Sequence, residues 1–252
     1  MSGAMNAAEQ VTAKATGPES LSAESRATAA RLAESYRVSP LDMVSNPSPL
    51  LVESTEEVAV PTPNGLFGLR AWRFADGAEH LSARALDRDG NPVPYEGGGA
   101  PAVRIHSECA TGDIFGSFRC DCGPQLENGL RIIGRTGGYL VYVRNHEGRG
   151  IGLVNKLRAY ALQDAGLDTL DANLALGLDG DMRDYSQAAL ILQELGVHEM
   201  RLVTNNPAKQ EALEGLGLRV TELIPDEIPA RVENAHYLHT KRERMRHLLE
   251  RA

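Results

Sequence analysis

Cysteines are scarce in this 252-residue sequence, and long apolar runs are missing altogether. The three cysteines are an odd number and all lie between residues 109 and 122, so they form a poor disulfide framework and a reasonable metal site. No apolar stretch approaches the roughly 18–20 residues needed to span a bilayer. The opening residues, MSGAMNAAEQ, lack the basic start and apolar stretch of a secretory signal. We therefore expect a cytoplasmic protein with no membrane partner.

A surplus of positive charge is missing as well. The chain holds 26 Lys and Arg against 34 Asp and Glu, which gives a net charge of -8. General nucleic-acid binders show a basic surplus or a clear basic stripe, so we expect no nucleic-acid partner. A small anionic ligand stays compatible, because it needs only a local cluster of Arg and Lys. The hydrophobic fraction of 42% and the charged fraction of 24% are ordinary for a globular protein with a core.

Residues 1–55 contain no motif that carries chemistry. Residues 1–19 are small and polar and predict a flexible tail, while residues 20–37 predict an Ala-rich helix begun by a Ser cap. Pro40, Pro47 and Pro49 then interrupt regular structure. We expect a flexible or helical N-terminal extension, either solvated or used as a subunit-contact arm, ahead of one domain over residues 56–252.

The remaining chain predicts an α/β fold. Residues 56–104 are β-rich, with turns at residues 63–65 and 87–91 and a glycine loop at 97–99. From residue 101 onward, strands alternate with helices. Strands are expected at residues 102–107, 139–144, 200–203 and 219–224, and helices at residues 124–136, 153–166, 185–196, 207–217 and 237–251. We predict a mixed sheet with flanking helices, preceded by the β-rich segment and the N-terminal extension.

The cysteines have the spacing of a metal site. Cys120 and Cys122 are two residues apart, so in an extended segment both side chains point to the same side, and Cys109 can join them through the intervening loop. Three thiolates suit Zn²⁺, and the sequence has no fourth cysteine to close the site. The open position is the arrangement of a catalytic zinc site. The alternative is three buried apolar cysteines.

Charged residues lie close to the cysteines in the sequence. A zinc ion with three thiolates has a formal charge of about -1 and acidifies water less than a three-histidine site, so a positive field or a proton acceptor nearby would help. Arg104 and Arg119 flank the segment, and His106 and Glu108 lie on the approach strand. We expect a functional role for His106, with a structural histidine as the alternative.

Two further loops each join a strand to a helix, where α/β folds usually bind ligands. In residues 144–150, the glycines let a ligand approach the backbone, Glu147 could accept from a base amino group, and Arg149 could pair with phosphate. In residues 204–209, Pro207 fits the first helical position, so free backbone N–H groups and Lys209 predict an anion site. The alternatives are a solvated turn and an ordinary capped helix.

Together these segments resemble the signature blocks of GTP cyclohydrolase II, in order and with family-like spacing. The matching stretches are HSECATGDIFGSFRCDCGPQLE, RNHEGRGIGLVNKLRAYALQDAGLDT, DMRDY and LVTNNPAK, with AHYLHTKRERMRHLL near the end. The resemblance covers residues 100–248 and leaves out residues 1–55, so residues 56–252 are expected to form the catalytic domain. It implies the monofunctional form, because no stretch resembles the dihydroxybutanone-phosphate synthase domain fused to many relatives.

The resemblance implies site residues and partners. Cys109, Cys120 and Cys122 are the implied zinc ligands, and Tyr160, Asp181 and Arg183 the implied catalytic residues. Contacts with GTP are implied for Arg104, Ile105, His106, Ser107, Glu108, Gln125, Glu147, Gly148, Arg149, Thr169, Thr204 and Lys209. The family is a homodimer that needs one Zn²⁺ per chain, and Mg²⁺ with the triphosphate.

The implied reaction is the first step of riboflavin biosynthesis. Water attacks C8 of guanine and opens the imidazole ring, formate and pyrophosphate leave, and the product is 2,5-diamino-6-(5-phosphoribosylamino)pyrimidin-4(3H)-one. Tyr160 could donate to the formyl oxygen or orient the water. Arg183 is either a nucleophile on the α-phosphorus, with Asp181 as its base, or an electrostatic stabiliser, since a guanidinium with a pKa above about 12 is a poor nucleophile.

Alternatives to this reaction stay open. His146 stands where the family commonly has Gln, and Arg246 where Gly is frequent, which leaves room for a paralogue that stops at the formylated product. A non-catalytic GTP-binding regulator is disfavoured, because Tyr160, Asp181 and Arg183 are retained. A zinc nucleoside deaminase would need P-C-x-x-C after its H-x-E, and this chain has C-x-C.

Overall fold

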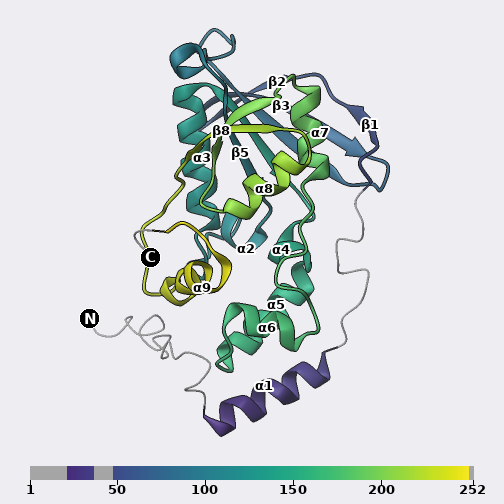
Figure 1. Cartoon of the computed structure of the whole chain (residues 1–252), viewed down its shortest axis with the longest axis vertical. Coiled ribbons are helices and arrows are strands. Elements are labelled where there is room, and N and C mark those ends of the chain that lie inside the picture. The colour runs from purple at the N-terminus through teal and green to yellow at the C-terminus, as the bar shows by residue number, and fades with distance from the viewer. Residues whose placement is uncertain (1–21, 37–47, 250–252) are drawn as a thin grey trace, which may run out of the picture.

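The computed structural model describes residues 22–36 and 48–249, which form one eight-stranded mixed sheet with helices around it (Figure 1). The strands are β1 (Leu51–Ser54), β2 (Val58–Thr62), β3 (Gly65–Phe74), β4 (Glu79–Leu86), β5 (Ala102–Ser107), β6 (Gly138–Val143), β7 (Glu199–Val203) and β8 (Arg219–Ile224). The helices are α1 (Ala23–Ser35), α2 (Ala110–Asp113), α3 (Cys122–Thr136), α4 (Glu147–Gly150), α5 (Leu153–Asp164), α6 (Thr169–Ala175), α7 (Ser186–Glu194), α8 (Pro207–Gly215) and α9 (Ala235–Met245), with a short 3₁₀ turn at Glu96–Gly98. The predicted α/β class and mixed sheet are confirmed.

The sheet has an antiparallel half and a parallel half. Its strand order is β1-β3-β4-β6-β5-β7-β8, with β2 added beside β3. Strand β3 pairs antiparallel with β1, β2 and β4, and β4 pairs antiparallel with β6. Strand β5 pairs in parallel with both β6 and β7, and β7 pairs in parallel with β8. The carboxyl ends of β5, β6 and β7 therefore meet at one edge of the sheet, and the loops that follow them carry the three motifs.

Helices cover both faces of the sheet, because successive side chains along its central strands point into two different cores, one on each face. In β6, Tyr139 and Val141 pack with Ile191 of α7, while Leu140 between them packs with Ile133 of α3. All five side chains are buried. This two-residue period fixes which face each strand presents, so the register of β5 and β6 is well determined. The loops at their ends are held accordingly.

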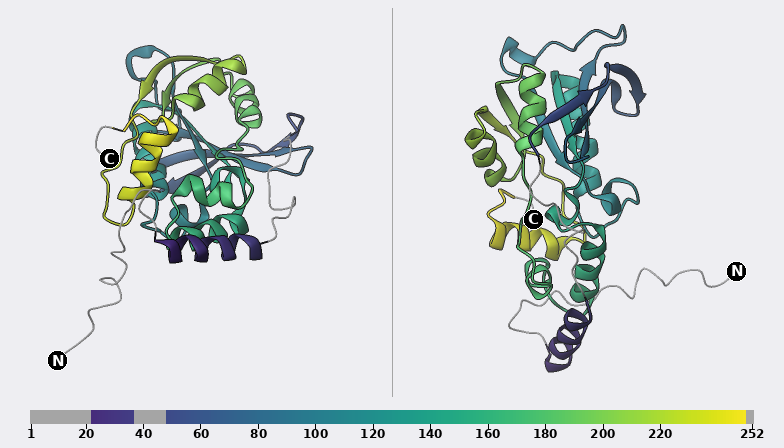
Figure 2. Two further views of the ribbon diagram at one scale, coloured as in Figure 1. Left: turned by 60° about the horizontal axis from the view of Figure 1, so that its bottom comes forward. Right: turned by 90° about the vertical axis from the view of Figure 1, so that its right-hand side faces the viewer.

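A second group of helices lies beyond the edge of the sheet where the motif loops meet. Helices α1, α5 and α6 share a small apolar core that includes Ala29, Leu162 and Ala172. Figures 1 and 2 show α1 lying across the end of the molecule, with α9 between the sheet and α6. The Ser22 side chain accepts from the backbone N–H of Ser25 at 3.0 Å and so caps α1. The helix and Ser cap predicted within residues 20–37 are confirmed for the described residues.

Some elements differ from the sequence prediction. Residues 51–54, which the prediction assigned to the N-terminal extension, form β1 and pair with β3. Helix α6 was not predicted; Asp168 caps it by accepting from the N–H groups of Leu170 and Asp171. Helix α3 begins at Cys122, before Pro124, and α9 ends at Met245. Residues 1–19, for which a flexible tail was predicted, lie outside the described residues, and so do Pro40 and Pro47. Within the described ranges, no helix is both long and apolar enough to cross a membrane.

Candidate active site

A cleft opens at the sheet edge where β5, β6 and β7 end. Its empty volume is about 1060 Å³, part of which is open to solvent. The predicted site residues that line it are Arg104, His106, Ser107, Glu108, Cys109, Cys120, Cys122, Gln125, Glu147, Gly148, Arg149, Tyr160, Thr169, Arg183, Thr204 and Lys209. Residues far apart in the sequence are therefore brought to one site by the topology of the sheet.

Two predicted residues do not line the cleft. The side chain of Ile105 lies in the core, and only its backbone oxygen, which accepts from Lys209 Nζ at 2.7 Å, faces the site. Asp181 instead contacts Arg183: its Oδ2 lies 2.5 Å from Arg183 Nη2 and its Oδ1 lies 2.8 Å from Nε. The predicted Asp181–Arg183 pair is therefore formed, and Arg183 is the member that reaches the cleft.

The three cysteine sulfurs converge on one point. Their Sγ atoms all lie within 4.8 Å of one another, and those of Cys109 and Cys120 are 3.7 Å apart. Two sulfurs that each lie about 2.3 Å from a tetrahedral zinc are about 3.8 Å apart, so the observed separation fits that metal. Cys122 is the third sulfur, and no His, Asp or Glu joins the cluster within the described residues.

Gly112 makes this convergence sterically feasible. A Cβ atom at Gly112 would lie 3.0 Å from Cys120 Sγ and 3.2 Å from Cys109 Sγ, so a larger side chain would push the sulfurs apart. In the sequence, Gly112 looks like an ordinary loop glycine. Its steric role depends on the approach of α2 to the start of α3, which local spacing does not reveal.

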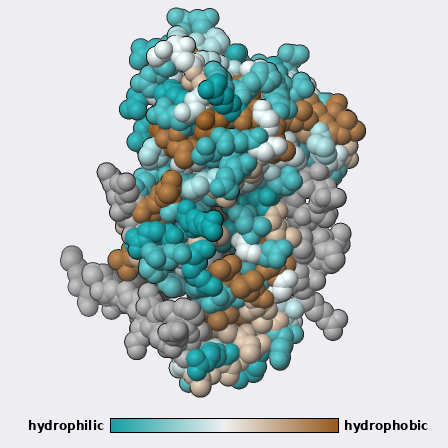
Figure 3. Space-filling model, in the orientation of Figure 1, coloured by the Kyte–Doolittle hydropathy of each residue, from teal (hydrophilic) through white to brown (hydrophobic). Residues whose placement is uncertain are grey.

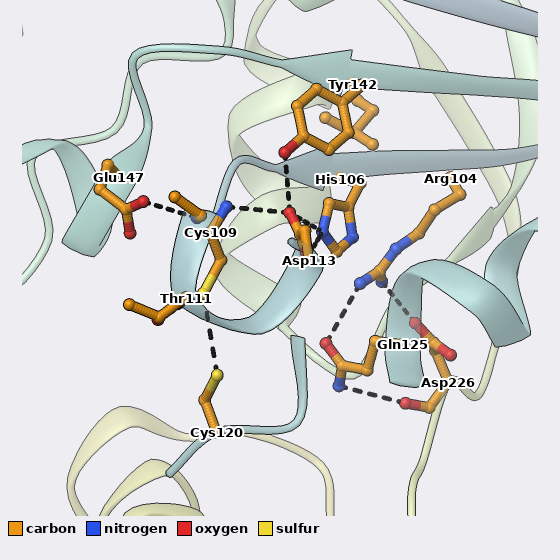
Figure 4. Close-up of polar contacts among 12 residues, drawn as sticks. Arg104, His106, Cys109, Thr111, Asp113, Cys120, Gln125, Tyr142, Glu147 and Asp226 are labelled. Atoms are coloured by element: carbon orange, nitrogen blue, oxygen red, sulfur yellow. Dashed lines mark hydrogen bonds and ion pairs between the residues drawn. The ribbon is translucent and has the colours of Figure 1, made fainter. Parts of the chain in front are cut away.

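Asp113 organises the loop that carries Cys109 (Figure 4). Its carboxylate accepts from Cys109 N at 3.0 Å and from the Tyr142 hydroxyl at 2.8 Å, and its Oδ1 lies 3.1 Å from His106 Nε2. Burial lowers the pKa of His106, so the ring is neutral near pH 7 and donates from Nε2. His106 thus lines the cleft while it helps to hold Asp113.

A second network fixes the adjoining wall of the cleft. Arg104 Nη1 lies 3.0 Å from Asp226 Oδ2 and donates to the Val203 carbonyl at 3.0 Å, and Nη2 donates to Gln125 Oε1 at 3.2 Å (Figure 4). Gln125 in turn donates to Asp121, between the two closely spaced cysteines, at 2.8 Å. Arg104, Asp121 and Asp226 are buried, and Gln125 is partly buried. These hydrogen bonds hold the predicted ligand groups Arg104 and Gln125 in place before any ligand arrives.

The loop after β6 is folded into an uncommon backbone conformation. Asn145, Gly148, Arg149 and Gly150 have φ values of 65°, 60°, 70° and 89°. At Gly148, a Cβ atom would lie 2.7 Å from the side chain of Ile151. His146 anchors this loop by donating from Nε2 to the Asp184 carbonyl at 2.9 Å, while its Nδ1 lies 3.2 Å from Ser107 Oγ. The loop that presents Arg149 is thereby tied to the loop that presents Arg183.

Several basic side chains line the cleft beside this loop. Both terminal nitrogens of Arg149 are buried with no hydrogen-bond partner among the described residues. Burial, followed by the charges of Arg104 and Arg183, lowers the pKa of Lys209 well below its ordinary value. Burial and nearby cations also lower the pKa of His247 to about 2. A cluster of cations with free donors suits a polyanionic group, which would restore the charge of Lys209.

Tyr160 lies near the cysteine sulfurs. Its hydroxyl is 3.5 Å from Thr111 Oγ1, and the Arg119 guanidinium lies 4.3 Å from the centre of its ring. Burial raises the pKa of Tyr160, so the phenol stays protonated near pH 7 and can donate. The cleft therefore combines a sulfur cluster and a phenol donor with several basic side chains.

Comparison with known proteins identifies the family. The family model described as GTP cyclohydrolase II matches residues 53–225. The chain belongs to the GTP cyclohydrolase II family. It is 52% identical over 198 residues to the riboflavin biosynthesis protein RibBA of Rhodococcus jostii, which covers 78% of this chain and 47% of that protein. It is 51% identical over 197 residues to RibBA of Mycobacterium marinum, covering 78% of this chain and 46% of that protein. The chain thus spans about half the length of these relatives.

In this member of the GTP cyclohydrolase II family, part of the cleft comes from residues that follow the stretch matched by the family model, which ends at residue 225. Tyr237, Lys241 and His247, in and after α9, also line it, although sequence reasoning assigned them no role. Lys241 Nζ lies 2.7 Å from Asp121 Oδ1, and Leu248 N donates to the Asn205 carbonyl at 2.8 Å. The C-terminal segment is thereby fastened to the sheet side of the cleft. The sequence offered one clue to this role: the C-terminal segment is basic, although the whole chain has a net negative charge.

Two departures from the family pattern have structural explanations. Arg246 follows α9 with a φ of 56°, the left-handed conformation that glycine adopts most easily at a helix end. His146 forms the hydrogen bonds to Asp184 and Ser107 described above, and burial lowers its pKa to about 3. Neither residue is among the predicted catalytic positions.

Proposed function

We propose that this chain is a zinc-dependent GTP cyclohydrolase II. It hydrolyses GTP, opens the imidazole ring at C8, and releases formate and pyrophosphate to give 2,5-diamino-6-(5-phosphoribosylamino)pyrimidin-4(3H)-one, the first step of riboflavin biosynthesis. The observation that carries the proposal is one cleft that holds both three converging cysteine sulfurs and several buried basic side chains. A nucleoside triphosphate offers a base on which a metal could act and phosphates that basic side chains could bind.

The three cysteines and Tyr160 are the proposed groups for ring opening. Cys109, Cys120 and Cys122 are the proposed Zn²⁺ ligands, at about one ion per chain. When bound, zinc supplies a nucleophile near neutral pH and polarises a carbonyl oxygen. The protonated Tyr160 is the proposed hydrogen-bond donor to the oxygen that becomes negative when the formyl group is released.

Basic side chains of the cleft are the proposed groups that hold the triphosphate. Arg149 and Lys209 donate to phosphate oxygens, and Mg²⁺ offsets their remaining charge. Burial by itself lowers the pKa of Arg183, but the neighbouring Tyr185 and Asp181 outweigh burial and leave it above its ordinary value. A guanidinium that keeps its proton is a poor nucleophile, so we propose that Arg183 stabilises charge on the α-phosphate. Asp181 then orients Arg183 and is not its base.

We also propose where this protein acts and which molecules it binds. The protein acts in the cytoplasm as a homodimer, with GTP as its small-molecule partner and without nucleic acid or membrane. Leu153, Val154 and Leu157 on α5 are about half exposed, and Figure 3 shows apolar patches between larger hydrophilic areas. Exposed apolar groups on one helix favour a subunit contact.

Incubation with GTP tests the proposed function directly. The purified protein with Zn²⁺ and Mg²⁺ is expected to consume GTP and to yield formate, pyrophosphate and the diaminopyrimidine product in equal amounts. A formylated pyrimidine without formate would indicate a paralogue that stops earlier. Ammonia would indicate a deaminase, and binding of GTP without turnover would indicate a regulator.

Variants of the cation cluster separate binding from chemistry. Lys209→Ala is expected to raise KM for GTP about 10- to 150-fold, because a charge-assisted contact contributes roughly 1.5–3 kcal/mol. Arg183→Ala is expected mainly to lower kcat, because Arg183 acts on charge that develops in the transition state. Steady-state kinetics of pyrophosphate release measure both.

Arg88→Ala is the matched control, since Arg88 lies in the exposed turn at residues 87–91 and is outside the cleft. It is expected to keep both constants. Pyrophosphate release at the parent rate by the Arg183→Ala variant would exclude a role of Arg183 at the α-phosphate.

A further inference from the structure

Lys156 is a buried cation to which sequence reasoning gave no role. It lies on α5, four residues before Tyr160, and only 7% of it is exposed. Its ammonium group has three N–H donors, and each finds an acceptor: Cys109 Sγ at 3.1 Å, Thr111 Oγ1 at 2.8 Å and Glu147 Oε1 at 2.5 Å. The donors are fully used within the protein, so the group is held at one position.

Glu147 fixes this position from the other side. Its second oxygen, Oε2, accepts from the backbone N–H of Ala110 at 2.7 Å, directly after Cys109 in the chain. Both carboxylate oxygens are therefore engaged, one with Lys156 and one with the backbone that carries Cys109. In this arrangement Glu147 holds the cation against the sulfur, a different role from the contact with a base amino group predicted from the sequence.

The hydrogen bond from Lys156 to Cys109 places a positive charge beside the proposed metal site. Three thiolates and one divalent ion have a net charge of about -1, and a buried negative site is unfavourable without a nearby cation. An N–H donor on a ligand sulfur withdraws electron density from it, and a cation beside that sulfur offsets part of the negative charge of the site. Of the buried cations in the cleft, Lys156 is the one that donates to a ligand sulfur among the hydrogen bonds of the described residues.

We propose that Lys156 is a positioning residue for the metal centre: held by Glu147, it donates to the Cys109 sulfur and offsets the negative charge of the three-cysteine site. The inference rests on the proposed zinc site and deepens it. A purely structural role, in which the Lys156–Glu147 ion pair only stabilises the fold, makes a different prediction, because such a role would not depend on contact with the sulfur.

Zinc affinity and the spectrum of the Co²⁺-substituted protein distinguish the two roles. Lys156→Met is expected to weaken Zn²⁺ binding about 10- to 100-fold in competition with a chromophoric chelator, the usual effect of removing a hydrogen-bond partner of a metal ligand. The sulfur-to-Co²⁺ charge-transfer band is expected to move to longer wavelength, because a thiolate without its donor gives up electrons more easily. Circular dichroism checks that the fold is retained.

Two further variants keep the test decisive if Lys156→Met folds poorly. The double variant Glu147→Gln/Lys156→Met leaves no unpaired buried charge and is expected to show the same loss of affinity and the same spectral shift. Lys209→Met removes another buried lysine of the cleft, one whose Nζ donates to the Ile105 carbonyl, and is expected to keep the zinc affinity and spectrum of the parent. A double variant with the parent's affinity and spectrum would overturn the inference. A parent that binds no zinc would overturn the metal site itself, so the two failures are distinguishable.

Discussion

Replacing Cys120 with serine is expected to abolish zinc binding and ring opening together. Cys120 Sγ lies 3.7 Å from Cys109 Sγ in the sulfur cluster, and a serine hydroxyl is a poor substitute for a thiolate at a soft metal site. Loss of the metal removes several kcal/mol of transition-state stabilisation, so formate release should fall by about 1,000-fold or more. Metal analysis of the purified variant and a formate assay measure the two losses.

The control for this variant is Ser117→Ala. Ser117 lies in the same loop, where its hydroxyl accepts from Arg119 N at 3.2 Å and touches no sulfur. It is expected to keep both zinc and formate release. Full ring-opening activity in a Cys120→Ser preparation that contains no zinc would contradict the proposed metal chemistry.

Tyr160→Phe is expected to separate the two hydrolytic events at the ring. Ring opening needs a nucleophile at C8, whereas formate release needs attack on a formamide, a poorer electrophile because nitrogen donates into its carbonyl. The second event should depend more on a donor to the developing oxyanion, and loss of such a donor typically costs about 100- to 1,000-fold. We expect the variant to retain zinc, to bind GTP, and to accumulate the formylated, ring-opened pyrimidine with little formate.

Chromatography of the pyrimidine products beside a formate assay makes this measurement. Tyr95→Phe is a suitable control, because the Tyr95 hydroxyl donates to the Tyr139 hydroxyl at 3.3 Å and lies outside the cleft. If Tyr160→Phe released formate as fast as the parent, Tyr160 would be a packing residue. His106 would then be the next donor to test.

The parts of the fold that were predictable are those determined by local pattern. The apolar runs of β5 and β6 and the amphipathic pattern of α3 lie almost where the sequence indicates, because each has a clear period and glycine or proline near its ends. Since the three motif loops follow parallel strands, their meeting at one sheet edge also followed from the predicted fold class. Helix α6 was missed because it is short and its cap, Asp168, also suits a turn.

The parts of the site that were not predictable depend on contacts between distant segments. Lys156 stands in the pattern of an ordinary charged helix residue, and its burial arises only when α2 and α4 dock against α5. Tyr237, Lys241 and His247 enter the cleft because the C-terminal segment returns to Asp121 and Asn205. No spacing in the sequence encodes such a return. Conversely, the resemblance implied a GTP contact for Ile105, yet alternation along β5 turns its side chain into the core.

The central claim, that three cysteines and one metal ion open the guanine ring, is tested most directly by adding zinc back to metal-free protein. The account predicts no formate from GTP without metal. It predicts formate release that rises linearly with added Zn²⁺ and levels off at about one equivalent per chain. Formate release at the full rate before any zinc is added, with metal analysis confirming its absence, would contradict the account.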